Sequence, residues 1–195
     1  LMKALELARR LGSAATECSA LNGLANVAID QGRIDEARSH YGAGLERARE
    51  VEDRGWQCSL LGNLGMLHAN VGRMDEARTC LEQALELART LADRRREGTL
   101  LCNLGMLHLV QRRLEQAIDV SEQALRVARE LGHRRVQGIV SCNLGLAAEE
   151  RGRTEDALAH FDAGLRVMRD LGDRRHEGQF LGYVGRTRAR QRQYT

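Results

Sequence analysis

Asn63, Asn103 and Asn143 are the residues whose type and spacing give the clearest chemical signal. Each stands directly before a Leu-Gly pair, and the three lie 40 residues apart. A side-chain amide carries both a donor and an acceptor, so it can satisfy a peptide bond whatever the neighbouring side chains are. One such bond contributes about 1 kcal/mol net, and three contribute roughly a hundredfold in affinity. Two interpretations stay open: the amides bind another main chain, or they join one helix of this chain to the next.

The cysteines do not have the spacing of a metal site. They are odd in number and scattered along the chain, at Cys18, Cys58, Cys80, Cys102 and Cys142. Two pairs are one period apart, which places their members at equivalent positions on neighbouring helices, about 8–10 Å apart. A disulfide does not tolerate that Cα separation. We therefore expect reduced, structural thiols and a cytoplasmic protein.

His68 and His108 are the candidates for an acid, a base or a metal ligand. Cys102 precedes His108 by six residues, a rotation of about 240° along a helix, so the two side chains do not share a face. The sequence has no Gly-rich phosphate loop, no nucleophile elbow and no metal-spaced cluster. We therefore expect core histidines and a protein that is not an enzyme, with no catalytic residue, metal ligand or cofactor.

The Asn-Leu-Gly phrase belongs to a repeat with a period of 40 residues. Residues 63–65, 103–105 and 143–145 carry it, and residues 183–185 carry the eroded form Tyr-Val-Gly. A unit of this length cannot bury its apolar face alone, so neighbouring units stack into a solenoid. Proline is absent, aromatic residues are 3%, and strong helix formers fill the segments. The sequence therefore predicts an all-α fold.

Residues 53–92 show the two helices of one unit. Asp53 is an N-cap for the first helix, and Gly72 supplies the left-handed residue that ends it. Asp75 lies in the first turn of the second helix, where the helix dipole favours anions. Arg112 stands where the other copies have this glycine, so its turn is predicted to be the least favourable.

Small residues recur inside both helices of the unit. A mid-helix glycine costs roughly 1 kcal/mol against alanine, and its recurrence therefore indicates close backbone approach. The glycines of the first helices are Gly65, Gly105, Gly145 and Gly185. The alanines expected at the contacts in the second helices are Ala37, Ala77, Ala117 and Ala157.

The period divides the chain into a single array covering residues 1–195. Full repeats are expected at 13–52, 53–92, 93–132 and 133–172. Residues 1–12 match a second helix without its first, and residues 173–195 match a first helix without its second, followed by a basic tail. Neither end carries the polar capping helix that an isolated array requires. We expect a piece of a longer array, whose exposed ends stack on further repeats or self-associate.

The charge pattern does not favour nucleic acid or a membrane. The formal charge of +3 is small, no apolar run approaches the roughly 20 residues of a membrane span, and no signal peptide opens the chain. Arginines gather at the inter-repeat corners 94–96, 134–135 and 174–175 and again in the tail. Acidic residues lie beside them and no stacking aromatics are interleaved. We therefore expect a solvated, ion-paired edge.

One pattern of residues resembles the tetratricopeptide repeat (TPR): Leu64-Gly65 on the first helix, followed by Ala77, Leu81 and Ala84 on the second. The pattern holds in four successive copies. The 40-residue unit and the Gly-Asp-Arg closure at 172–174 resemble the longer subclass of kinesin light chains, Pins-type spindle adaptors and bacterial peptide-sensing regulators. The resemblance implies a right-handed TPR superhelix of antiparallel helix pairs whose first helices line a concave face. It also implies the binding of a protein or peptide on that face.

The resemblance also implies roles for individual residues. In the longer subclass an Asn before Leu-Gly often faces the groove and bonds the peptide main chain, and Asn63, Asn103 and Asn143 match that place. The neighbours expected to set specificity are Met66 and Met106 as apolar contacts, and Ser59, Thr99, Asn70 and Glu150 as polar ones. Chaperone-binding members hold a carboxylate with basic residues at places that include Asn22, Asn26 and Arg186. Only Arg186 is basic, so a carboxylate clamp is not expected.

The favoured function is a non-catalytic scaffold that binds a peptide or partner segment in its concave groove, as a module of a larger signalling or regulatory protein. A structural spacer or self-association array is the main alternative. A nucleic-acid-binding array that uses the Arg-rich edge is the least favoured.

Overall fold

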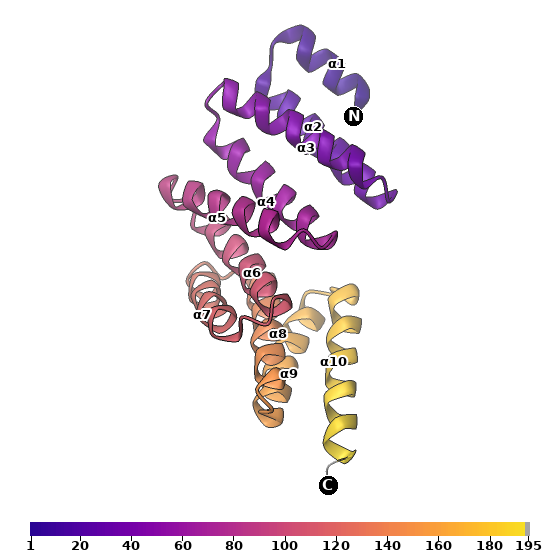
Figure 1. Cartoon of the computed structure of the whole chain (residues 1–195), viewed down its shortest axis with the longest axis vertical. Coiled ribbons are helices and arrows are strands. Elements are labelled where there is room, and N and C mark those ends of the chain that lie inside the picture. The colour runs from indigo at the N-terminus through magenta and orange to yellow at the C-terminus, as the bar shows by residue number, and fades with distance from the viewer. Residues whose placement is uncertain (194–195) are drawn as a thin grey trace. The chain divides into compact units, whose positions relative to one another are not determined.

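The structure is a computed structural model that describes residues 1–193, and in these residues the chain is helical throughout, without strands (Figure 1). The helices are α1 (Met2–Leu11), α2 (Ala14–Asp30), α3 (Ile34–Glu50), α4 (Arg54–Asn70), α5 (Met74–Thr90), α6 (Arg94–Val110), α7 (Leu114–Glu130), α8 (Arg134–Glu150), α9 (Thr154–Asp170) and α10 (Arg174–Gln193). The all-α fold predicted from the repeat is confirmed.

Short turns separate the helices, with two residues between α1 and α2 and three residues between each later pair, and one residue of each turn has a positive φ. These residues follow one another every 20 positions: Gly12, Gly32, Glu52, Gly72, Ala92, Arg112, Gly132, Gly152 and Gly172. Glycine adopts this left-handed conformation without the steric cost that a Cβ imposes. The sequence prediction is therefore confirmed at Gly72, and Arg112 (φ 57°) is strained as expected. Glu52 (φ 55°) and Ala92 (φ 52°) are two further strained turns, between repeats.

Asp53 caps α4, as the sequence predicts. Its Oδ1 accepts a hydrogen bond of 2.9 Å from the backbone N–H of Trp56. Asp173 does the same for α10, accepting from the backbone N–H of His176 at 3.3 Å. These bonds satisfy donors that the first turn of a helix otherwise leaves unpaired.

Small residues let the two helices of each repeat approach closely. Ala77 and Ala157 are fully buried, and a Cβ built on Gly65 would lie 2.8 Å from Leu81 Cγ. A Cβ on Gly145 would lie 2.6 Å from the ring of Phe161. With contacts this short, a Cβ at either position would force the neighbouring side chain to shift, so the close approach inferred from the sequence is confirmed at both glycines.

Gly185 differs from its counterparts in the earlier repeats. A Cβ built there would meet no atom within 4 Å. The reason is that no second helix covers this face of α10 within residues 1–193. The expectation of close packing at Gly185 is wrong for this structure.

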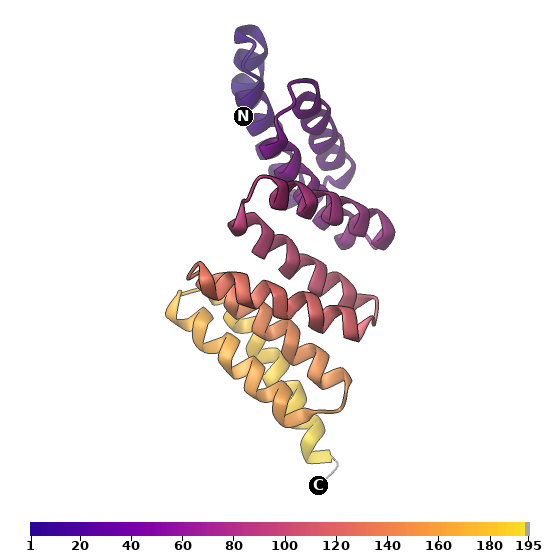
Figure 2. The ribbon, with the colours of Figure 1, turned by 90° about the vertical axis from the view of Figure 1, so that its left-hand side faces the viewer.

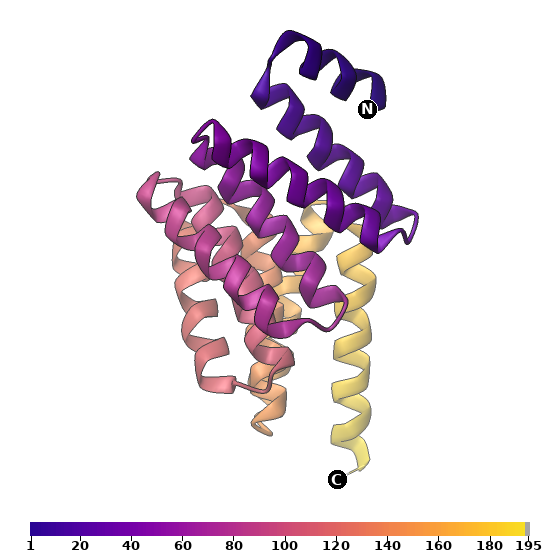
Figure 3. The same cartoon turned by 45° about the horizontal axis from the view of Figure 1, so that its top comes forward.

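The array comprises two compact units, Leu1–Asp93 and Arg94–Thr195. In the first, α1 to α5 pack as successive neighbours (Figure 3), with Leu5, Ala20 and Leu21 in one core cluster. In the second, α6 to α10 pack in the same way, and successive helices run antiparallel (Figure 2). The core of this unit contains Phe161 and Phe180.

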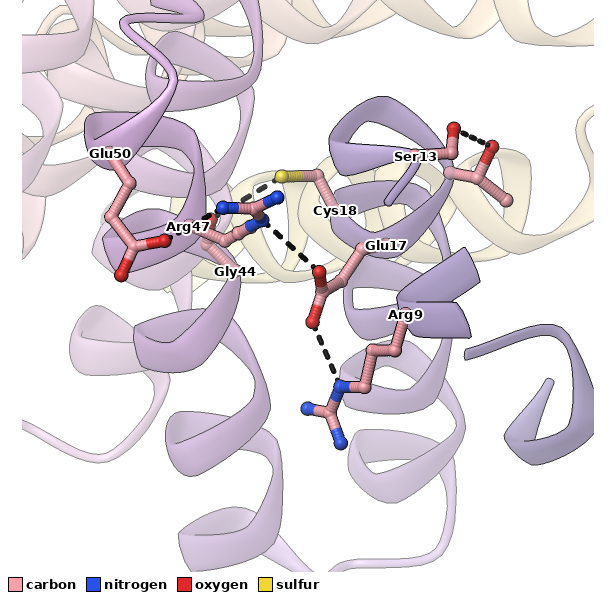
Figure 4. Close-up of polar contacts among 8 residues, drawn as sticks. Arg9, Ser13, Glu17, Cys18, Gly44, Arg47 and Glu50 are labelled. Carbon is pink, nitrogen blue, oxygen red and sulfur yellow. Dashed lines mark hydrogen bonds and ion pairs between the residues drawn. The ribbon is translucent and has the colours of Figure 1, made fainter. Parts of the chain in front are cut away.

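A side chain in the first turn of several first helices links them to neighbouring helices. In Figure 4, Glu17 accepts bonds from Arg9 (2.9 Å) and Arg47 (3.2 Å), which joins α1, α2 and α3. Gln57 and Gln137 hold the same position and instead donate to the carbonyls of Ala48 (3.1 Å) and Ala128 (2.9 Å). Neighbouring repeats are thus joined by polar bonds as well as by apolar packing.

In the described part of the chain, the helices are all too short or too polar to cross a bilayer.

Candidate functional site

Asn143 lies inside the stack of repeats. Its side chain is 1% exposed, and its Nδ2 donates to the backbone carbonyl of Cys102 at 3.2 Å, with the Cys102 Sγ at 3.9 Å. The amide therefore joins α8 to α6, which is the second of the two interpretations open from the sequence. In this structure helix packing covers the Asn143 side chain, and its contact with a ligand stays a prediction.

Asn63 is half-buried and bonds a side chain rather than a backbone group. Its Nδ2 donates to Oδ1 of Asn22 at 2.7 Å, which joins α4 to α2. Asn22 and Asn63 were both predicted site residues, and the structure brings them together. The two amides form one half-exposed polar pair on the first unit.

Asn103 is half-buried on α6. Among residues 1–193, no hydrogen bond joins its amide to another residue. Of the three repeated amides, this one has both donors and its acceptor available to a ligand.

The remaining predicted contacts differ in exposure. Met66 and Met106 are half-buried, and Asn70 is exposed. Ser59 and Thr99 turn their hydroxyls back to their own helices, donating to the carbonyls of Gly55 (3.0 Å) and Arg95 (3.2 Å) respectively. Asn26 is exposed, and its Oδ1 accepts a hydrogen bond from the Tyr41 hydroxyl.

Arg186 belongs to an ion cluster that the sequence analysis missed. Glu149 on α8, with a side chain only 12% exposed, accepts from Arg186 (3.3 Å), Arg190 (3.3 Å) and Thr187 (3.0 Å) on α10. The Arg186 guanidinium also lies 5.1 Å from the ring centroid of Tyr183, a cation–π geometry. The signal available in the sequence was the i, i+4 spacing of the two arginines, which places both on one face of a helix.

The first helices of the second unit carry matching rows of side chains. On α6 the row is Thr99, Asn103, Met106 and Val110; on α8 it is Ile139, Asn143, Leu146 and Glu150; on α10 it is Gln179, Tyr183, Arg186 and Arg190. Spacings of three and four residues place each row on one face of its helix. Apart from Asn143, every member is half-buried or exposed. We call these rows the first-helix face.

Burial shifts the pKa values of two thiols and of the imidazole of His68. Burial raises the pKa of Cys102 to about 12 and that of Cys142 to about 12, so the thiolate fraction at neutral pH is negligible. Burial also lowers the pKa of His68, which keeps its imidazole neutral. Within residues 1–193, no cluster of His, Cys, Asp or Glu could hold a metal ion.

Four arginines at the inter-repeat corners form ion pairs, as the sequence predicts for this edge. The pairs are Arg94 with Glu97 (2.6 Å) and Glu130 (2.7 Å), Arg134 with Asp170 (2.7 Å), Arg135 with Asp173 (3.3 Å) and Arg174 with Glu177 (3.4 Å). Carboxylates thus neutralise much of the charge that a polyanion would need.

Helix pairs that repeat every 40 residues, joined by three-residue turns and mid-helix glycine contacts, define a helical-repeat protein of the α-solenoid class. The family model described as "Tetratricopeptide repeat" matches residues 16–90, 56–130 and 96–170, and the chain belongs to the tetratricopeptide repeat family. This membership fits a protein-interaction scaffold. No curated protein matches the sequence.

Several solved structures share the fold. BtubC (BKLC) from P. vanneervenii has a TM-score of 0.75 at 21% identity, with 100% of this chain and 90% of that chain covered. A STAND-class signal transduction ATPase with a tetratricopeptide repeat sensor, from Pyrococcus horikoshii, has a TM-score of 0.80 at 18% identity, with 95% and 29% covered. A Rap protein complexed with Competence and Sporulation Factor has a TM-score of 0.82 at 16% identity, with 93% and 51% covered. At these identities the likeness concerns the fold alone.

Proposed function

We propose that the array is a protein-interaction module that binds an extended peptide segment along its first-helix face, with Asn103 as a partner of the peptide main chain. The observation that carries the proposal is the half-buried Asn103 amide, which makes no hydrogen bond within residues 1–193. An amide that is ready to donate and accept matches the needs of a peptide bond. The Rap protein of similar fold, complexed with Competence and Sporulation Factor, supports a ligand-binding use of such arrays.

The neighbours of Asn103 supply the side-chain contacts in this proposal. Met106 lies three residues further along the same face and is half-buried, and its flexible thioether adapts to different apolar groups. Val110 extends the apolar surface and is 57% exposed. A peptide with apolar side chains on one side fits this surface, while its main chain pairs with the Asn103 amide.

Peptide selection tests this function directly. The purified chain is exposed to a random peptide library, and the enriched sequences are resynthesised and titrated. We expect saturable binding by peptides that share apolar positions. A library that gives no enriched sequence, or peptides that bind equally well to the heat-unfolded chain, would contradict the proposal.

Self-association is a second candidate, favoured by the apolar side chains on α1. Leu7 is 54% exposed and Leu11 is 72% exposed, and their spacing of four residues places them on one face of α1. Light scattering over a wide range of concentrations distinguishes the two functions. A mass that rises with concentration supports self-association, and a constant monomer mass removes it.

A further inference from the structure

A pocket with a volume of about 310 Å³ opens between α7, α8 and α9. Its apolar lining residues are Leu144 and Ala148 of α8 and Ile118 of α7. Leu144 lines the pocket, and Leu146 belongs to the first-helix face. The two residues are separated by a rotation of about 200° around α8, so the pocket lies on a different side of this helix from the first-helix face. The pocket is therefore separate from the proposed peptide site.

The residue type at the position of Ala148 varies along the array, and Ala28 holds this position in the first full repeat. Ala148 holds the position that His68 and His108 hold in the two preceding repeats. Both imidazoles are 8% exposed and fill the space beside their helices. The alanine side chain is a methyl group, so the planar five-membered ring of the histidine is missing beside α8 in the fourth full repeat.

The surroundings of His68 support this correspondence. The charged groups that act on the imidazole are those of Glu76, Arg73 and Arg38. Their counterparts two periods later are Asp156, Arg153 and Ile118, and all three line the pocket. The pocket thus occupies in the fourth repeat the space that an imidazole fills in the second.

The charge of the lining has also changed between the two repeats. Around His68 stand two guanidinium groups and one carboxylate. In the pocket, Ile118 replaces one of those guanidiniums, and Glu122 adds a carboxylate where Gly42 stands two periods earlier. Counted at neutral pH, the ionised groups change from one net positive charge to one net negative charge.

Glu122 is the carboxylate free to meet a ligand. Asp156 is already paired with Arg153 at 3.6 Å, whereas Glu122 makes no ion pair within residues 1–193. His160 also lines the pocket, and burial lowers its pKa. Its neutral imidazole adds no positive charge that would compete with a cation.

We propose that this pocket binds a small organic cation that carries a planar ring, with the ring against the apolar lining residues and the cationic group paired with Glu122. The volume fits such a ligand, because specific small-molecule pockets begin at about 300 Å³ and a dry cavity of about 150 Å³ already accommodates benzene. An imidazole bearing a protonated amine has both features in one molecule.

Histamine is the probe that tests the proposal on the complete 195-residue chain. Calorimetric titration or chemical-shift perturbation at neutral pH should show saturable binding of histamine. Imidazole alone should bind more weakly, and imidazole-4-acetate, which has the same ring and the opposite charge, should not bind.

Two variants and one control localise the effect. Ala148→His rebuilds the imidazole of the earlier repeats and should abolish histamine binding. Glu122→Gln should weaken it about threefold, the range of a partly exposed charge pair. Glu82→Gln removes the exposed carboxylate at the equivalent position one repeat earlier and should bind as the wild type does.

Three results would overturn the proposal: no binding of histamine, equal binding of imidazole-4-acetate, or undiminished binding by Ala148→His. If Ala148→His does not reach the helical content of the wild type, Glu122→Gln carries the test, because Glu122 is exposed and its replacement leaves the packing intact. Histamine binding equal in Glu122→Gln and wild type then overturns the proposal.

Discussion

The side-chain amide of Asn143 on α8 donates a hydrogen bond of 3.2 Å to the backbone carbonyl of Cys102 on α6. Asn143 is 1% exposed, and its Oδ1 has no hydrogen-bond partner within residues 1–193. The bond joins the first helices of two successive repeats. Asparagine at the same repeat position therefore has two environments. The side chain is fully buried at Asn143 and half-buried at Asn103.

This difference predicts unequal effects of one substitution. Asn143→Asp replaces the donor with an oxygen that faces the Cys102 carbonyl, and it buries a carboxylate without a partner. We expect a loss of about 3–5 kcal/mol in the free energy of unfolding. Asn103→Asp should cost less than about 1 kcal/mol because the side chain reaches water. Urea unfolding of both variants checks this, and equal losses would contradict the burial assigned to Asn143.

Gly145 and Gly185 form a second matched pair. Gly145→Ala should destabilise the protein by about 1–3 kcal/mol, because the new Cβ would lie 2.6 Å from the Phe161 ring. Gly185→Ala meets no atom within 4 Å and should instead stabilise α10 by about 0.5–1 kcal/mol through helix propensity. Thermal unfolding of the two variants should give shifts of opposite sign. Shifts of the same sign would show that the helix-pair contact at Gly145 is not tight.

Ser121 is a polar residue in a core position. Its side chain is 1% exposed and its Oγ has no hydrogen-bond partner within residues 1–193, whereas the equivalent residues in the other full repeats are Tyr41, Leu81 and Phe161. Ser121→Ala removes an unsatisfied buried hydroxyl. We expect the free energy of unfolding to rise by about 1 kcal/mol, measured in urea. A decrease would mean that the hydroxyl is hydrogen-bonded in solution.

Buried neutral histidine predicts a loss of stability in acid. Burial lowers the pKa of His68 below the usual 6.5 of a histidine side chain, with Arg73 and Arg38 acting in the same direction and Glu76 against it. The unfolded chain therefore binds the proton first, so this contribution is fully present above pH 6.5 and is lost as the pH falls through the folded-state pKa. The free energy of unfolding should decrease on acidification, and the decrease should be smaller in His68→Gln. An identical pH profile for the variant would exclude His68 as a cause.

Sequence periodicity was sufficient to predict most of the fold. The repeat of Leu-Gly and the capping residue Asp53 located the helices, and Gly72 located their turns, because these features act locally and recur in every copy. Two strained turns were not predicted. Glu52 and Ala92 adopt positive φ, although residues with a Cβ disfavour this conformation. The turn that joins one repeat to the next requires it whichever residue is present.

The candidate site was less predictable, because burial depends on neighbours far away in sequence. Asn63, Asn103 and Asn143 are identical in type and local context, yet only packing between repeats decides which of them reaches solvent. The pocket beside Ala148 was also not predictable from local sequence. It is recognised only when the surroundings of Ala148 are compared with those of the imidazoles in the earlier repeats. Glu149 was overlooked in favour of Glu150, because only the structure shows which of the two faces α10.

Binding of a library-selected peptide to Asn103→Ala, measured by titration calorimetry, tests the central claim most directly. Loss of one net hydrogen bond of about 1 kcal/mol should weaken binding roughly fivefold, while the unfolding midpoint stays that of the wild type. Gln83→Ala, at an exposed position of the second helix α5, should leave the affinity unchanged. A folded Asn103→Ala variant that binds the peptide as tightly as the wild type would contradict the claim.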